Sequence, residues 1–160
     1  MDPLQVAMTG VRMGERYLQI FCSDAALTRG LATKTGLSGL AALAAADESQ
    51  ARQARKAAEK AGALLDLQVT PPTRLPWDEG AFDMVVVDNT GDGFGALNHA
   101  DRATCLQECR RVLRQGGRVE FIERSTEPAA VEAQLAAAGF KPVRTLAERD
   151  GFRFVEALKG

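Results

Sequence analysis

Polar residues recur at the points where short apolar stretches of the sequence end. Five such residues carry a carboxylate or a hydroxyl: Asp24, Asp47, Thr70, Asp88 and Glu123. If the stretches are strands of one parallel sheet, their carboxyl ends meet at one edge, where α/β proteins bind ligands. Carboxylates and hydroxyls at that edge can hydrogen-bond a nucleotide or another small metabolite. The spacing therefore predicts a small-molecule crevice.

Other residue types suggest chemistry less directly. His99 is the only histidine in the chain, and an imidazole can act as a general base near neutral pH. A histidine on a surface loop is the other interpretation. Cys105 and Cys109 lie one helical turn apart, which would suit a metal, but no further cysteine or histidine is close in sequence. We therefore expect these thiols to pack in the core and expect no metal site. No catalytic residue is assigned.

The crevice residues must be positioned by strands and helices that alternate along the chain. Short apolar or alternating stretches predict strands at 16–22, 40–46, 64–69, 82–88, 118–123, 142–148 and 152–158. Helical spacing predicts helices at 3–13, 24–34, 48–61, 101–114 and 128–138. Asp47 is expected to be the N-cap of its helix. Asp150 and Gly151 are typical of a tight hairpin turn between the last two strands.

This alternation predicts an α/β fold. Strands that alternate with helices form a mostly parallel sheet covered on both faces, and the closing hairpin adds antiparallel pairing. We expect a three-layer sandwich of about seven strands. The length of 160 residues fits one domain, expected over residues 1–160.

Composition narrows the classes of partner and the compartment. Lys plus Arg number 20 and Asp plus Glu number 21, for a net charge of −1, so no charge excess draws the chain to nucleic acid or to an anionic membrane. The N-terminus shows no signal-peptide pattern, and the longest apolar run, 40–46, is too short to span a bilayer. Three cysteines are consistent with a reducing compartment. We expect a cytoplasmic protein.

Two longer stretches carry a family resemblance. Neither the dinucleotide pattern G-x-G-x-x-G after the first strand nor a P-loop is present. The stretches LPWDEGAFDMVVVDN (75–89) and ECRRVLRQGGRVEFIER (108–124) resemble the class I S-adenosylmethionine-dependent methyltransferases of the type-11 kind. The terminal stretch 136–159 is similar to that family's last helix and closing hairpin. The resemblance implies a Rossmann-like fold and methyl transfer to a small molecule.

The same resemblance implies where S-adenosylmethionine would bind. The family's first strand ends in G-x-G-x-G, and Phe21, Ser23 and Ala25 stand at its three glycine positions. Side chains there fill space that the cofactor would use. Alanines occupy the end of the second strand, where the family has an acid, and Asp47 is the nearest substitute. The implied cofactor-binding residues are Phe21, Cys22, Ser23, Asp24, Asp47, Thr70, Leu75 and Asp88.

Three functions are therefore open from the sequence. The first is an active methyltransferase with Asn89 and His99 facing a small-molecule substrate. The second is a non-catalytic binding or oligomerisation module of the same fold that has lost the cofactor, with a homodimer as one assembly. Its interface would be formed by exposed Trp77 or Phe94, or by the apolar face of the first helix. The third is a reshaped crevice for another nucleotide or metabolite.

Overall fold

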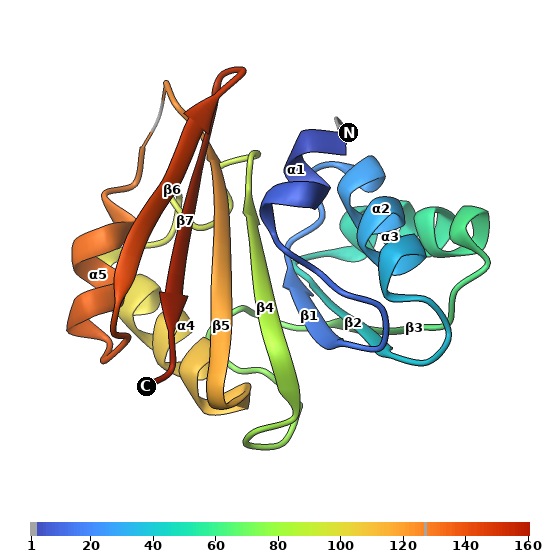
Figure 1. Cartoon of the computed structure of the whole chain (residues 1–160), viewed down its shortest axis with the longest axis horizontal. Coiled ribbons are helices and arrows are strands. Elements are labelled where there is room, and N and C mark those ends of the chain that lie inside the picture. Colours follow the sequence, from blue (N-terminus) through green and yellow to red (C-terminus); the bar gives the residue numbers. More distant parts are fainter. Residues whose placement is uncertain (1–2, 127) are drawn as a thin grey trace.

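A central sheet with helices on both faces is built from alternating strands and helices, as the sequence predicts (Figure 1). The computed structural model describes residues 3–126 and 128–160. Within these residues the strands are β1 (Arg16–Ile20), β2 (Leu40–Ala45), β3 (Leu65–Val69), β4 (Phe82–Asn89), β5 (Leu113–Arg124), β6 (Val143–Arg149) and β7 (Phe152–Leu158). The helices are α1 (Pro3–Met8), α2 (Ala25–Thr35), α3 (Glu48–Ala61), α4 (His99–Val112) and α5 (Val131–Ala137).

The seven strands form one sheet in the order β3-β2-β1-β4-β5-β7-β6. Strands β1 to β5 are parallel, and β7 pairs antiparallel with both β5 and β6. Asp150 and Gly151 both have positive φ, which is the conformation of a type I′ hairpin turn. The predicted architecture and hairpin are confirmed.

Strand β4 shows why both faces are covered. Successive side chains of this strand point to opposite faces of the sheet. Val85 and Val87 pack in the core beneath α4 and α5, while Met84 and Val86 pack with residues of α1 and α2. A strand that is apolar on both sides is the expected pattern for the centre of a parallel sheet. Cys105 and Cys109 of α4 are fully buried in the first of these cores, so their predicted core packing is confirmed.

Several element boundaries differ from the prediction; among them, the strand expected over 16–22 ends at Ile20 and the helix expected over 128–138 begins at Val131. The helix expected over 3–13 ends at Met8, because Gly10 has a φ of 66° and the Thr9 hydroxyl donates to the Val6 carbonyl and accepts from the Val11 amide. Helix α4 begins at His99, with Asn98 as its N-cap. Strand β5 begins at Leu113 and not at 118, and residues 115–117, which lie between the expected helix and strand, form an irregularity within the strand. Local hydrogen bonds and pairing override the periodicity at these points.

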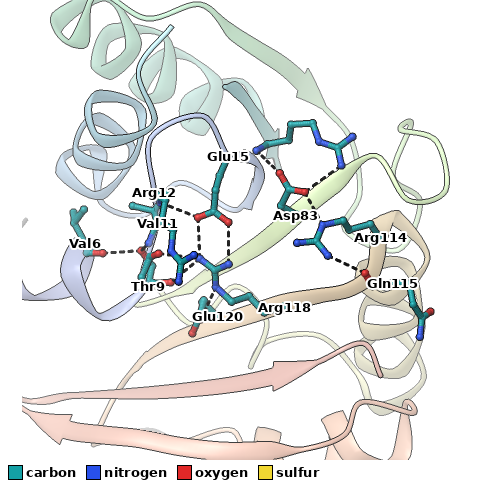
Figure 2. Close-up of polar contacts among 12 residues, drawn as sticks. Val6, Thr9, Val11, Arg12, Glu15, Asp83, Arg114, Gln115, Arg118 and Glu120 are labelled. Carbon is teal, nitrogen blue, oxygen red and sulfur yellow. Dashed lines mark hydrogen bonds and ion pairs between the residues drawn. The ribbon is translucent and has the colours of Figure 1, made fainter. Parts of the chain in front are cut away.

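An ionic network lies at the amino end of the strands, opposite the predicted crevice (Figure 2). The guanidinium of Arg118 contacts both carboxylate oxygens of Glu15, at 2.9 and 3.0 Å, and Glu120 at 3.2 Å. It also donates to the carbonyl oxygens of Thr9 and Gly10. A strand residue thereby holds the segment that follows α1.

Helix α1 also meets α2 at close range. A Cβ added to Gly30 would lie 2.5 Å from a methyl carbon of Val6, so only glycine fits this crossing without movement. Among the described residues, no helix combines the length and apolar character needed to cross a bilayer.

Candidate functional site at the sheet switch point

The candidate site lies where the direction of the strand order reverses. From β1 the chain proceeds to β2 and β3 on one side, and from β4 it proceeds to β5 on the other. The carboxyl ends of the two adjacent strands β1 and β4 therefore form the topological switch point, where open α/β sheets bind their ligands. The structure places Phe21 to Asp24 and Asp88 to Thr90 at this position.

Asp88 is the hydrogen-bonding centre of the switch point. Its side chain is fully buried, and its Oδ2 accepts from the main-chain amides of Ser23 at 2.9 Å and Asp24 at 3.2 Å. Its Oδ1 accepts from the Thr90 amide and, at 2.6 Å, from the Thr90 hydroxyl. Burial raises the pKa of Asp88, and these hydrogen bonds act in the opposite direction. The carboxylate thus binds the two loops of the crevice to each other.

Gln50 performs a similar role between β1 and β2. The side-chain oxygen of this α3 residue accepts from the Cys22 amide at 3.1 Å and from the Ala46 amide at 3.0 Å. The Cys22 thiol lies 3.4 Å from the Thr28 hydroxyl, and burial raises the pKa of this thiol. Cys22 is therefore a neutral, packed side chain.

Phe21 fills the space between the two loops. It has a φ of 68°, a left-handed conformation that favours glycine, and only 3% of its surface is exposed. The side-chain amide of Gln19 donates to the Phe21 carbonyl at 2.9 Å. On the other side, a Cβ added to Gly93 would lie 3.0 Å from the Phe21 ring, so the loop after β4 rests directly on the ring.

The remaining predicted cofactor residues have structural partners. Asp24 caps α2 and accepts from the Ala26 amide, and Asp47 caps α3 and accepts from the Gln50 amide, both at 2.9 Å. The expected N-cap role of Asp47 is confirmed. The Thr70 hydroxyl donates to the Arg74 carbonyl at 2.7 Å. Leu75 is buried in the core beneath α4.

Asn89 and His99, expected to face a substrate, lie in different places. The side-chain oxygen of Asn89 accepts from the amides of Phe94 and Gly95, and it orders the loop after β4. The Asn89 side-chain nitrogen is buried without a hydrogen-bond partner within the described part of the chain. His99 lines a hollow of about 120 Å³ between α4 and α5. Phe94, expected to be exposed, is fully buried and packs edge-on against Phe121.

A larger hollow lies beside the crevice, between the loops that follow β4 and β5. Its volume is about 400 Å³, and it is shallow and open to solvent. Arg102 lines it, donates to the Gly95 carbonyl and lies 5.9 Å from the centre of the Phe94 ring. The other lining residues are Asp92, Gly95, Pro128, Ala129 and Ala130.

Sequence reasoning found the residues after β1 and β4 but missed three that complete the site. Gln19, Gln50 and Gly93 contact the crevice through hydrogen bonds or close approach. Gln50 follows the N-cap Asp47 by three residues, which is the spacing of a local capping partner, and nothing in the sequence indicates that it reaches β1. The structure brings Phe21, Cys22, Ser23, Asp24 and Asp88 together, and Asp47 is linked to them through Gln50.

Comparison with known proteins gives one consistent result. Residues 4–142 match the ubiE/COQ5 methyltransferase family. The demethylmenaquinone methyltransferase of Bacillus subtilis is 31% identical over 116 residues, which cover 72% of this chain and 48% of that protein. The ubiquinone/menaquinone biosynthesis C-methyltransferase UbiE of Cupriavidus necator is 29% identical over 144 residues, which cover 90% of this chain and 57% of that protein.

Solved structures support the fold. A SAM-dependent methyltransferase from Aquifex aeolicus superimposes with a TM-score of 0.79 at 17% identity, covering 99% of this chain and 90% of that one. The chain spans about half the length of the Bacillus subtilis relative and a smaller part, 34%, of the 2-methoxy-6-polyprenyl-1,4-benzoquinol methylase of Leishmania donovani.

Proposed function

Because this chain belongs to the ubiE/COQ5 methyltransferase family, we propose that it binds S-adenosylmethionine and supports methyl transfer to a small molecule. The observation that carries the proposal is the family match over residues 4–142, which includes both strands of the switch point and both loops of the crevice. Methyl transfer of this kind depends mainly on holding two reactants in line, so the lack of an assigned acid–base pair does not exclude it.

The acceptor proposed is the ring of a quinol. Relatives named above are quinone and quinol methyltransferases. An open hollow beside the crevice, lined by Arg102, is the proposed place for such a ring. A small acceptor also agrees with the net charge of −1, which offers no attraction to nucleic acid. Three free, buried thiols support a reducing, cytoplasmic setting.

The conformation described here does not fit the cofactor. The Phe21 ring occupies the switch point, and the loop amides that would face a ligand already donate to Asp88 and Gln50. This one observation favours the second candidate, a non-catalytic module of the same fold. The comparisons favour the methyltransferase.

Ligand binding separates the two candidates. S-adenosylhomocysteine is titrated by calorimetry into the wild-type chain and into Phe21→Gly, which removes the obstructing ring. Binding by the wild type, with a rise in melting temperature, supports the methyltransferase; ligand at a hundred times its Kd adds about 2.7 kcal/mol. Absence of binding by the wild type at millimolar ligand contradicts it, and binding by Phe21→Gly alone favours the non-catalytic module that has lost the cofactor.

A further inference from the structure

We infer that Phe21 is the residue that closes the switch-point crevice and sets its affinity for the ligand, which must displace the ring in order to enter. The inference rests on the proposed function for the identity of that ligand. Phe21 would then determine the affinity of the site for its ligand, a role that its position after β1 alone does not indicate.

The first support is the conformation of Phe21. An aromatic residue at a φ of 68° is disfavoured by contact between its Cβ and the backbone. Such a conformation persists only where the surroundings determine it. Here the Gln19 side chain holds the carbonyl, the Ala44 carbonyl accepts from the Phe21 amide at 3.0 Å, and Gly93 presses on the ring. The chain therefore maintains a strained residue at the one place where its ring blocks the crevice.

The second support is independent of the ring. Main-chain amides at the ends of β1 and β2 are the donors that a ligand at this edge would use, and the chain's own side chains occupy them. Asp88 accepts two of them and Gln50 accepts the other two, at distances from 2.9 to 3.2 Å. The amides are those of Cys22, Ser23, Asp24 and Ala46. Ring and acceptors together close the site from both sides.

Closure has a quantitative consequence. When only a fraction of the molecules is open, the apparent Kd equals the intrinsic Kd divided by that fraction. Replacing Phe21 by glycine removes the ring and suits the left-handed backbone, so it raises the open fraction. Affinity then rises although no contact with the ligand has been added.

The test measures the Kd of S-adenosylhomocysteine by calorimetry for the wild type, Phe21→Gly and a control, Phe82→Leu. Phe82 is also fully buried, but it begins β4 at the opposite end of the strand from Asn89. The control therefore loses core packing without opening the crevice. We expect Phe21→Gly to bind at least tenfold more tightly than the wild type, and Phe82→Leu to bind as the wild type does.

The outcomes separate the inference from the proposed function. If the wild type binds as tightly as Phe21→Gly, or more tightly, the inference is wrong and the proposed function stands. If only Phe21→Gly binds at millimolar ligand, the inference stands and the proposed function is wrong; if neither binds, both are wrong. Circular dichroism checks that the glycine variant folds. Should it not fold, Phe21→Asn takes its place in the same titration, because asparagine removes the ring and tolerates a left-handed backbone: tighter binding than the wild type supports closure by the ring, and equal or weaker binding overturns it.

Discussion

Arg118 connects strand β5 to the segment after α1, and its removal should have a large effect on stability. Its side chain is 19% exposed and donates to Glu15, Glu120 and the carbonyl oxygens of Thr9 and Gly10. Arg118→Met keeps the apolar stem but removes every one of these donors. Burial alone would raise the pKa of Glu15, whereas the hydrogen bonds from Arg118 and from a neighbouring amide lower it. The variant therefore leaves the Glu15 carboxylate without the guanidinium that pairs with it.

The expected loss of stability follows from the burial of the ion pair between Arg118 and Glu15. Removing one partner of a buried ion pair costs roughly 3–5 kcal/mol, and the partial exposure of Arg118 places it at the low end, about 3 kcal/mol. For a chain of this size each kcal/mol shifts the melting temperature by about 2–4 °C, so the expected fall is roughly 6–12 °C. Arg16→Met is the matched control. Arg16 is 44% exposed, and its partner Asp83 also binds Arg114, so its loss should cost less than about 1 kcal/mol.

Urea unfolding followed by circular dichroism measures both variants against the wild type. Equal slopes of the unfolding free energy against urea concentration would show that the variants expose the same surface on unfolding as the wild type. A loss of less than about 1 kcal/mol for Arg118→Met, or a loss no greater than that of Arg16→Met, would contradict this prediction, because burial would then not increase the contribution of the ion pair to stability.

Three further predictions concern single side chains. Burial raises the pKa of Glu120 to about 10 from 4.5, so stability from its bound proton is full below pH 4.5 and falls as the pH rises toward 10. Glu120→Gln should match the wild type in acid and exceed its urea midpoint above neutral pH; a constant difference would contradict this. Gln19→Glu places a buried carboxylate against the Phe21 carbonyl and should cost at least about 2 kcal/mol, a loss that shrinks in acid as the group regains a proton to donate. Asp47→Ala removes the cap on the Gln50 amide and should lower the free energy of unfolding in urea by about 1 kcal/mol. Unchanged stability would contradict a stabilising role for the cap.

Local patterns were sufficient to predict the fold. The alternation of apolar runs and helical spacing identified the strands of the sheet, and Asp150 with Gly151 identified the hairpin. Boundaries differed where interactions over a few residues prevail, as at Thr9, whose hydroxyl bonds end the first helix. Periodicity reports which face of a segment is buried, and it contains no information on such terminal bonds.

The site was predictable only in part, because its closing contacts span long distances in sequence. The sequence indicated that Phe21 stands at a glycine position and that Asp88 lies at the crevice. It did not indicate that Gln50 accepts from an amide 28 positions away, or that Gly93 lies on the Phe21 ring. Both contacts depend on how α3 and the loop after β4 are placed by the packing of the whole sheet.

The double attachment of α1 has a practical consequence for how the chain can be shortened. Val11 is buried among Leu27 and Leu31 of α2, and Val6 fits the notch left by Gly30. A version that began at β1 would expose this apolar surface to water and leave the Arg118 guanidinium without the two carbonyls it binds. Such a version should self-associate. Shortened versions should therefore keep α1 and the segment that follows it.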